Sequence, residues 1–395
     1  MNRYTLLLST LCLASLQHVQ ADLTIPGDGS DGALNITEDT VIDLSKAVTG
    51  KWDQNNAANA GHGVYDPEKW AIVFKYSSVN IAAETAGVPS QLVGRTLRFT
   101  NHPSRAPVVW LVQGDVVING IVSLRGEGTT RDSVLMLTPR EPGPGGFRGG
   151  AFGPSGSGTG YGPGGQADGS PWGAYLGSYG NPQIIPLIGG SGSRSREYWG
   201  SAAGGGAILI AASGSITVNG IIDARGGAPG ENVYPAADGA IKLIGSSVTG
   251  NGTLDAPFLG RIRVETVSPM AATLKTFPET IGVPPADPPI LWPAGNAPKA
   301  RIVSVDAVPA PEDPKSPVVA AADLAIQNNA PVSIIIETLD FPIEGVVQLA
   351  VIPKFGQRGW LTATRVSGDI TKATWRVITT LPQGFVTLQA RATQP

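Results

Sequence analysis

The segment at residues 207–227, AILIAASGSITVNGIIDARGG, recurs in similar form at two other places in the chain, and this repetition strongly constrains the fold. It reads as apolar strands at 207–211 and 215–218, an Asn-Gly corner at 219–220 and a third strand at 221–224. Strands and corners follow one another too closely for a sheet of hairpins. Repeated short strands predict a solenoid, in which each unit pairs with the next one.

The repeat aligns residues that are far apart in the chain. Residues 108–127 (VVWLVQGDVVINGIVSLRGE) match 207–227, and residues 248–256 (VTGNGTLDA) match its second half. The Asn-Gly corners are therefore expected to stack, with Asn119, Asn219 and Asn251 forming a ladder of side-chain amides. Asparagine and glycine both tolerate positive φ, which we expect at a sharp corner between sheets.

Residues 1–21 have the pattern of a secretory signal peptide. Arg3 precedes a short apolar run, and Val19-Gln20-Ala21 ends in a small residue suited to cleavage. The run is too short to span a bilayer. The only cysteine, Cys12, lies within it and follows a leucine, so lipid anchoring is not expected. The chain is therefore predicted to be secreted, to the periplasm, cell surface or medium, and to carry no disulfide or thiolate metal site after cleavage.

Composition excludes some classes of partner. The chain has 28 basic and 31 acidic residues without clustering, which argues against a nucleic-acid or anionic-membrane surface. Charged residues make up only 15%, whereas 42% are apolar and 52 residues are glycine. An apolar fraction of this size buries a core, so a β-rich extracellular protein is expected and disorder is not.

The predicted fold is all-β, with a parallel β-helix that contains a long glycine-rich insertion and is followed by an immunoglobulin-like β-sandwich. In the insertion, 23 of 64 residues are glycine, and seven prolines between 277 and 299 predict a stiff linker outside any sheet. Regular strand spacing and alternation in TWRVITT and VTLQARA indicate the sandwich. The boundaries are 1–21 for the signal peptide, 22–276 for the β-helix domain, 143–206 for its insertion, 277–299 for the linker and 300–395 for the sandwich.

With these repeats, the chain resembles right-handed parallel β-helix proteins of the pectin-lyase-like type. It also resembles glycine-rich secreted bacterial proteins of unassigned function, which share the strings EPGPGGFRGG (141–150), YGNPQIIPLIGGSG (179–192) and GGGAILIAASGSITVNGIIDARGG (204–227). The second resemblance extends to about Glu265. It implies a location and an architecture, and no activity.

Enzymes with β-helix folds use clustered carboxylates and basic residues. Lyases of this kind bind calcium through aspartates and abstract a proton with a basic side chain, whereas hydrolases use paired carboxylates. The catalytic candidates are Asp223, Arg225 and Asp255, which fall at matching repeat positions and also suit a simple charge pair or a contact with polysaccharide. The wider set adds Asp115, Arg125, Arg261 and Arg263. Asp115 precedes its corner while the other aspartates follow theirs, so no ladder of three carboxylates is expected.

Aromatic residues of the insertion are the second candidate surface. The ligand-binding candidates are Tyr161, Trp172, Tyr175, Tyr198 and Trp199. Such rings stack on sugars, and they serve equally as anchors of an ordered glycine-rich segment packed along the solenoid. His62 and His102 have no partner at metal or catalytic spacing.

The sequence favours a secreted, non-enzymatic structural or adhesive protein of the bacterial cell surface or extracellular matrix. The alternatives are a β-helix polysaccharide lyase or glycoside hydrolase, and a carbohydrate-binding protein that uses the aromatic residues. Expected partners are extracellular polysaccharide or cell-envelope components, with no nucleic acid and no membrane span. No cofactor or metal is predicted; calcium would enter only with the lyase alternative.

Overall fold

The computed structural model describes residues 23–54, 61–83, 95–132, 134–153, 156–164, 179–195, 200–230, 235–314, 322–327 and 329–394. Across these ranges the regular structure is β-strand, with two short 3-10 helices, η1 (Leu44–Lys46) and η3 (Leu135–Leu137), and no α-helix. The predicted all-β class is confirmed. Nowhere in the described ranges does a helix have the length and apolar character needed to cross a membrane.

Three sheets run side by side through the first part of the chain, and we call them the three-sheet stack. The first sheet contains, in spatial order, β1 (Ala33–Ile36), β6 (Ser78–Ile81), β9 (Val116–Ile118), β14 (Ile216–Val218) and β17 (Val248–Thr249). The second sheet contains β2 (Thr40–Asp43), β7 (Thr96–Thr100), β10 (Ile121–Ser123), β15 (Ile221–Asp223), β18 (Thr253–Asp255) and β20 (Lys275–Phe277). The large sheet contains β21 (Gly282–Val283), β19 (Arg261–Thr266), β16 (Ala240–Gly245), β13 (Ala207–Ala212), β8 (Val108–Val112), β5 (Ala71–Tyr76), β4 (Val64–Asp66) and β3 (Val48–Thr49).

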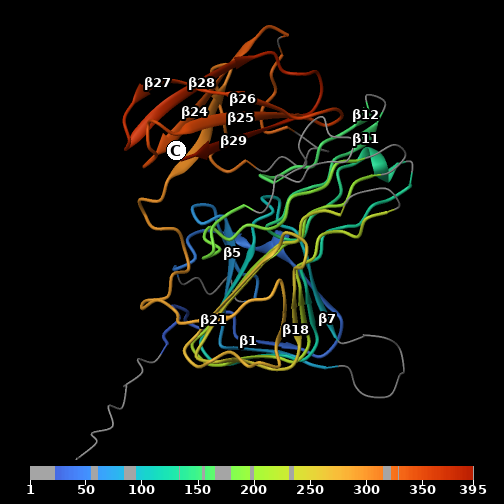
Figure 1. Ribbon diagram of the computed structural model, residues 1–395, viewed down its shortest axis with the longest axis vertical. Helices are drawn as coiled ribbons and strands as arrows, with labels where there is room; N and C mark the ends of the chain where they lie inside the picture. Colours follow the sequence, from blue (N-terminus) through green and yellow to red (C-terminus); the bar gives the residue numbers. More distant parts are fainter. Residues whose placement is uncertain are drawn as a thin grey trace, which may run out of the picture.

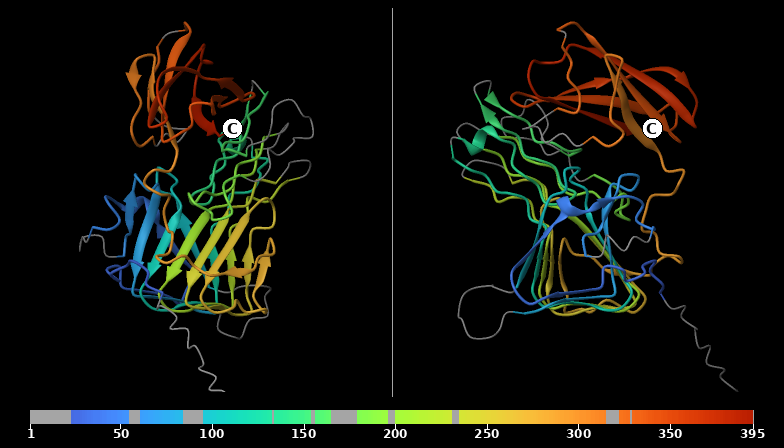
Figure 2. Two further views of the ribbon diagram at one scale, coloured as in Figure 1. Left: turned by 60° about the vertical axis from the view of Figure 1, so that its left-hand side comes forward. Right: turned by 180° about the vertical axis from the view of Figure 1, so that it is seen from behind.

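The chain visits the three sheets in the same order in successive turns. β8 leads to β9 and β10, β13 to β14 and β15, and β16 to β17 and β18. Each of these strands pairs in parallel with its counterpart in the next turn, so that Ile121 pairs with Ile221 and Asp223 with Asp255. Figure 1 shows β1, β5 and β18 on different sides of the stack, and Figure 2 shows the strands of the large sheet lying side by side. The register is the one that the sequence repeat predicts.

The main core lies between the three sheets. Trp110 of the large sheet, Ile118 of the first and Ile222 of the second are all fully buried in it. β14 alternates buried Ile216 and Val218 with a partly exposed residue, as expected for a strand with one face on a core.

The large sheet is covered on both faces, because a second apolar cluster packs against its outer side. Leu111 and Leu209 of the sheet meet Ile25 from the N-terminal segment and Leu291 from the proline-rich segment. Sheets covered on both faces have strands that are apolar throughout, which accounts for VVWLV and AILIAA.

The prediction that the stiff linker at 277–299 lies outside any sheet is wrong in part. β20 ends within this segment at Phe277, and β21 (Gly282–Val283) pairs with β19. Beyond them, the ring of Trp292 lies 5.6 Å from that of Trp52. The prolines stop the chain from forming long strands, but the apolar residues between them still bury surface against the large sheet.

The corners stack as the Asn-Gly doublets predict, but for a different reason. Asn219 Nδ2 donates to Asn119 Oδ1 at 2.8 Å, which is one step of the expected ladder. The φ angles of Gly120, Gly220 and Gly252 lie outside the left-handed region, so the expectation of positive φ is wrong. Glycine is required by close approach instead, because a Cβ on Gly220 would lie 1.8 Å from the carbonyl oxygen of Gly120.

Apart from a small hairpin at 152–157, the described part of the glycine-rich insertion rises from the stack as extended chains that are not β-strands (Figure 2). We call it, with its neighbours, the glycine bundle, comprising 124–130, 143–150, 158–162, 189–195, 201–206, 224–228 and 236–239. At its centre, Ala203 and Gly206 donate to the carbonyls of Glu127 and Leu124 in one neighbouring segment. The intervening N–H groups, at positions 204 and 205, donate to two other segments, at Phe147 and Ala237. A return to the same neighbour after three residues is the periodicity of polyproline II.

Glycine is needed in the bundle because backbone packs directly on backbone. A Cβ on Gly204 would lie 1.8 Å from the carbonyl oxygen of Gly190, and one on Gly239 would lie 1.6 Å from that of Gly206. Polyproline II has no internal hydrogen bonds, so its peptide groups are paired only if other chains come this close. The predicted close approach is confirmed for Gly204, Gly239 and most other described glycines of the bundle, although the arrangement differs from a loop.

The C-terminal part consists of antiparallel sheets. One contains β23 (Val308–Pro309), β22 (Lys299–Val305), β24 (Val332–Leu339), β28 (Lys372–Thr379) and β27 (Thr364–Gly368). The other contains β26 (Gly359–Thr362), β25 (Val346–Pro353) and β29 (Val386–Thr393), and a separate small hairpin, β11 (Phe152–Gly153) with β12 (Gly156–Ser157), belongs to the insertion. Side chains of Ile334, Trp375 and Leu349 fill the core between the two C-terminal sheets.

The C-terminal sheets rest on the glycine bundle. Tyr161 of the bundle packs against Ala350 and Ile352 of β25. The peptide of Arg358 donates to Thr159 Oγ1 at 3.1 Å, and its guanidinium Nη1 donates to the carbonyl of Gly162 at 3.1 Å. Figure 1 shows β11 and β12 beside the strands of these sheets. The second part of the chain is therefore tied to the first through buried contacts.

Candidate functional site

The three catalytic candidates meet where the second sheet ends. Asp223 is the last residue of β15 and Asp255 the last residue of β18, and the two are direct partners in the parallel register. Arg225 follows two residues after Asp223, so its side chain reaches back over both carboxylates. The three residues that the repeat spacing predicted to be neighbours are therefore close together in the structure.

Arg225 joins the two aspartates. Its Nη2 and Nε donate to the two carboxylate oxygens of Asp223 at 2.8 and 3.0 Å, a forked pairing, and its Nε lies 3.2 Å from Asp255 Oδ2. The hydrogen bonds and charges of Asp223 raise the pKa of the guanidinium above its usual range. Burial raises the pKa of Asp255 while Arg225 opposes that rise.

A third carboxylate, Asp238, lies in the same group and was not nominated from the sequence. It is only 6% exposed and accepts hydrogen bonds from the backbone N–H groups of Gly226 and Phe258, each at 2.6 Å. Burial raises its pKa to about 6, with a smaller contribution from the charges of Asp255 and Asp223, and the two N–H donors oppose the rise. Asp238 lies between repeat units, in the segment AADGAIKL, so no alignment of the repeats points to it.

The group as a whole is organised as a structural charge cluster. Both oxygens of Asp223 are bound by Arg225, and the two oxygens of Asp238 accept one backbone N–H each. A glycosidase pair needs one protonated carboxyl and one carboxylate on either side of an open space for the sugar. The geometry instead joins adjacent turns through Arg225, which contacts the carboxylates of both Asp223 and Asp255.

The wider lyase set does not gather around this cluster. Asp115 lies at the start of β9 and accepts from the peptide N–H and hydroxyl of Ser215 at 2.7 and 2.9 Å. It therefore joins two turns near the first sheet. Arg261 and Arg263 belong to β19 of the large sheet. Arg125 is exposed and contributes its charge to the surroundings of Asp255.

Of the aromatic candidates, the structure describes Tyr161 alone. The others, Trp172, Tyr175, Tyr198 and Trp199, lie outside the described residues. Tyr161 is 6% exposed, and burial raises the pKa of its hydroxyl to about 12. Its ring is an anchor between the bundle and β25 and does not offer a free face for stacking on a sugar.

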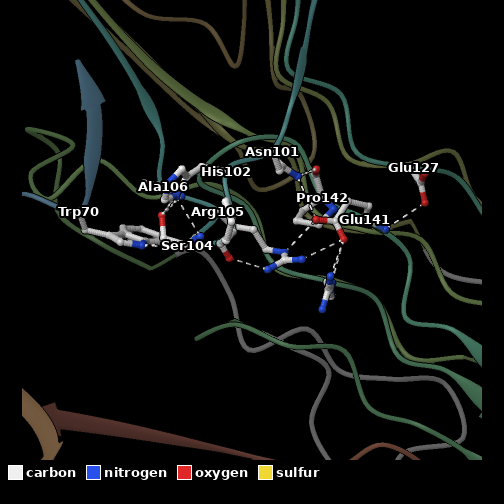
Figure 3. A network of polar contacts seen from close by, with 11 residues as sticks. Trp70, Asn101, His102, Ser104, Arg105, Ala106, Glu127, Glu141 and Pro142 are labelled. Atoms are coloured by element: carbon white, nitrogen blue, oxygen red, sulfur yellow. Dashed lines mark hydrogen bonds and ion pairs between the residues drawn. The ribbon is translucent and has the colours of Figure 1, made fainter. Parts of the chain in front are cut away.

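A further polar network, centred on Glu141, fastens the glycine bundle to the stack (Figure 3). Its carboxylate accepts from Arg105 Nε at 2.8 Å and from Arg148 Nε at 2.9 Å, while Asn101 donates at 3.2 Å. Burial opposes the charge of Glu141, but the two guanidinium groups outweigh it and hold the pKa below its ordinary value. The backbone N–H of Glu141 donates to Glu127 Oε2, visible at the right of Figure 3.

Among the ion pairs of the described residues, the most deeply buried lies on the outer side of the large sheet. Lys242 of β16 is 1% exposed and lies 3.4 Å from Glu265 Oε1 of β19. Its Nζ also donates to the carbonyl of Ile290 at 3.0 Å, so it holds the proline-rich segment against the sheet. Burial lowers the pKa of Lys242, and Glu265 opposes that shift.

A metal centre finds no support in the part of the chain that the structure describes. No group of three or more His, Cys, Asp or Glu side chains there is arranged to hold a metal ion. His102 contacts Ser104 Oγ at 2.8 Å, and its ring lies 4.3 Å from that of Tyr65.

Comparisons with known proteins return no family model, no curated relative and no solved structure that matches this chain.

Proposed function

We propose that this chain is a secreted structural or adhesive protein of a bacterial cell surface or extracellular matrix. In this proposal, residues 22–276 form a right-handed parallel β-helix related in type to the pectin-lyase-like and glycine-rich secreted proteins that the sequence resembles. Residues 300–395 form an immunoglobulin-like sandwich that mediates attachment or assembly. Support for the β-helix comes from the parallel pairing of β8 with β13 and of β13 with β16, which their counterparts in the other two sheets repeat.

The observation that carries the proposal is the close packing of backbone on backbone that the glycines allow. The segment 203–206 directs four successive N–H groups to three neighbouring chains, and the glycines around it let those chains touch. An arrangement of this kind makes a rigid body and leaves few side chains for chemistry. It suits a protein whose task is to hold a shape outside the cell.

Secretion is part of the proposal, and its support is the signal-peptide pattern of residues 1–21. Expression of the full chain in a bacterial host, followed by mass spectrometry of the exported protein, tests it. The expected mature N-terminus is Asp22. Recovery of an intact N-terminus in the cytoplasmic fraction would contradict the export step.

The alternative of a polysaccharide lyase or hydrolase is tested with the purified mature chain. Acidic and neutral polysaccharides are incubated with it, and new reducing ends and unsaturated uronates are measured. The expected result is no turnover. Turnover that Asp223→Asn and Arg225→Gln abolish, but that persists with the exposed control Asp53→Asn, would overturn the proposal.

The carbohydrate-binding alternative rests on Trp172, Tyr175, Tyr198 and Trp199. A glycan array probed with the intact chain and with Trp172→Ala and Trp199→Ala variants tests it. Binding that falls in both variants would favour a lectin role over a purely structural one. Equal signals from all three proteins would leave the structural role in place.

A further inference from the structure

The Asn-Gly corners of the stack carry a reactive pair of groups that the structural role does not use. In such a pair, the backbone nitrogen of glycine attacks the side-chain carbonyl carbon of asparagine, because glycine has no side chain to hinder the approach. The new carbon–nitrogen bond closes a succinimide ring, and the side-chain nitrogen leaves as ammonia. Water then opens the ring at either carbonyl, which gives aspartate or isoaspartate. The pairs are Asn119-Gly120, Asn219-Gly220 and Asn251-Gly252.

The glycine nitrogen, which is the nucleophile of this reaction, is held at each of these corners. The N–H groups of Gly120, Gly220 and Gly252 donate to carbonyls of the preceding turn at 3.2, 2.9 and 2.9 Å. The carbonyls of the same three glycines accept from the next turn at 2.9, 2.9 and 3.0 Å. A donated N–H gives up its proton less readily, and a peptide bound on both sides does not rotate toward the asparagine side chain. The fold should therefore slow the reaction at every corner.

The asparagine half of the corner differs along the stack. Asn219 Nδ2 donates to Asn119 Oδ1 at 2.8 Å, so these two side chains hold each other in place. Their backbone N–H groups are also bound, that of Asn119 by the carbonyl of Ile81 and that of Asn219 by the carbonyl of Ile118, both at 2.8 Å. The first two asparagines are therefore anchored through backbone and side chain.

Asn251 lacks both anchors. Its side chain is exposed, and neither its amide nor its backbone N–H makes a hydrogen bond with the residues that the structure describes. It follows Gly250, which has a φ of +119°, whereas Asn119 and Asn219 directly follow the strands β9 and β14. This asparagine therefore keeps the freedom to turn its side-chain carbonyl toward the nitrogen of Gly252.

We propose that Asn251 is a site of spontaneous conversion to aspartate and isoaspartate in the folded chain, and that the stack protects Asn119 and Asn219 from the same reaction. Asparagine is among the thermolabile residues of proteins, so a long-lived extracellular chain is exposed to this chemistry. The conversion is separate from the structural function proposed above, because it depends on the corners alone.

Isoaspartate at position 251 is expected to loosen the end of the stack. It inserts one additional carbon atom into the backbone, next to a glycine where a Cβ would already lie 2.1 Å from the carbonyl oxygen of Gly220. The longer corner does not fit this contact. The carbonyl of Gly252 also accepts from the N–H of Lys275 at 3.0 Å, so displacement of the corner should disturb the last strand of the second sheet, β20.

Peptide mass spectrometry after incubation in heavy-oxygen water tests the assignment. Mature chain is incubated at neutral pH, folded or in urea, and is then digested in ordinary water. Ring opening during the incubation incorporates the heavy isotope, so conversion during digestion is not counted. In urea we expect similar rates at the three corners. In the folded chain we expect label at Asn251 at least tenfold faster than at Asn119 or Asn219.

The same digests contain an internal control. Asn296 is exposed but is followed by alanine, so it should stay unlabelled in the folded chain. Equal rates at the three corners of the folded chain, or a faster rate at Asn219 than at Asn251, would overturn the assignment to Asn251. Rates in the folded chain as high as those in urea would overturn the protection by the stack.

Two variants test the effect on the last turn. After incubation, the parent should contain a second population with a lower urea midpoint, whereas Asn251→Gln should keep one midpoint because its longer side chain closes the ring more slowly. Freshly prepared Asn251→Asp carries the charge of the product on an ordinary backbone and should keep the parent midpoint. A lower midpoint in fresh Asn251→Asp, or equal ageing of Asn251→Gln and the parent, would contradict the role of the lengthened corner.

Discussion

Gly220 lies against the backbone of Gly120, its equivalent one hundred residues earlier, so closely that a Cβ on Gly220 would stand 1.8 Å from the carbonyl oxygen of Gly120. The same contact recurs one turn later, where a Cβ on Gly252 would stand 2.1 Å from the carbonyl oxygen of Gly220. Backbone on both sides of the contact cannot move away as a flexible side chain does. The corner therefore sets the distance between successive turns.

Replacement of Gly220 by alanine is expected to destabilise the chain strongly. Forcing a methyl group into this contact should lower the free energy of unfolding by about 3 kcal/mol or more, at the upper end for overpacked sites. The urea midpoint measures the loss. Gly295→Ala is the matched control, since a Cβ there meets nothing within 4 Å, and its midpoint should change little. Equal midpoints for the two variants would show that the corner tolerates a side chain.

Replacement of Glu141 by glutamine should release the glycine bundle from the stack. Arg148, whose side chain is 9% exposed, would lose the charge that it faces. Because the side chain of Glu141 is 33% exposed, the cost should be about 2 kcal/mol, between the values for exposed and for buried pairs. Glu127→Gln is the control, because Glu127 is about half exposed and its pair with Arg140 is worth about 1 kcal/mol or less. Limited proteolysis between residues 128 and 206, compared with the parent chain, measures the release.

The same substitution should also change how the stability of the chain depends on pH. The folded pKa of Glu141 lies below its ordinary value, so its contribution is present above the unfolded pKa and is lost as pH falls through the folded one. The difference in urea midpoint between the parent and Glu141→Gln should therefore shrink in acid. A constant difference from pH 7 down to pH 3 would contradict the assigned role.

For Asp238 we expect the opposite dependence of stability on pH. Its folded pKa of about 6 lies above the ordinary aspartate value of 3.8, so the native state holds the proton more tightly. Its contribution to stability is then fully present below the unfolded pKa and is lost as pH rises through about 6, a change on the order of 3 kcal/mol. Asp238→Asn cannot titrate, so the parent should lose stability relative to this variant between pH 4 and 6. Parallel stability curves for the two proteins across that window would rule this out.

Tyr161→Ala tests the contact between the glycine bundle and the C-terminal sheets. Removal of this buried ring from Ala350 and Ile352 should loosen the junction, and loss of a buried aromatic side chain costs about 3–5 kcal/mol. We expect calorimetry to show one main transition for the parent and two separated transitions for the variant. Val366→Ala, on exposed β27, is the control and should keep the parent profile. A single unshifted transition in Tyr161→Ala would mean that other contacts hold the two parts together.

The stacked strands were predictable because their signal is local and repeated. The alignments of Ile121 with Ile221 and of Asp223 with Asp255 follow directly from matching the sequence to itself, and the structure pairs the same residues. The burial of both faces of the large sheet was harder to predict. An apolar strand such as VVWLV indicates that both of its faces are covered, but it does not indicate which segments cover them. Leu291 and Trp292 lie among prolines that suggested a linker.

The candidate site was predictable only where the repeat contained it. Asp223, Arg225 and Asp255 occupy repeat positions and do meet, whereas Asp238 and Glu141 lie between repeats and gain their partners from tertiary packing. Tyr161 could be read as a free aromatic residue because its burial depends on β25, almost two hundred residues later. The glycine bundle has no apolar period, so a strand-by-strand reading leaves it as a loop.

At 203–206 the direction of the backbone N–H groups repeats every three residues, and this repeat restricts which insertions and deletions the segment can accept. One added residue would turn the rest of that segment by about a third of a revolution, and every later N–H would point at the wrong neighbour. Three added residues would restore the direction after a rise of about 9 Å. Insertions and deletions within the bundle should therefore be tolerated when they add or remove three residues at a time, because only then do the later N–H groups keep their partners.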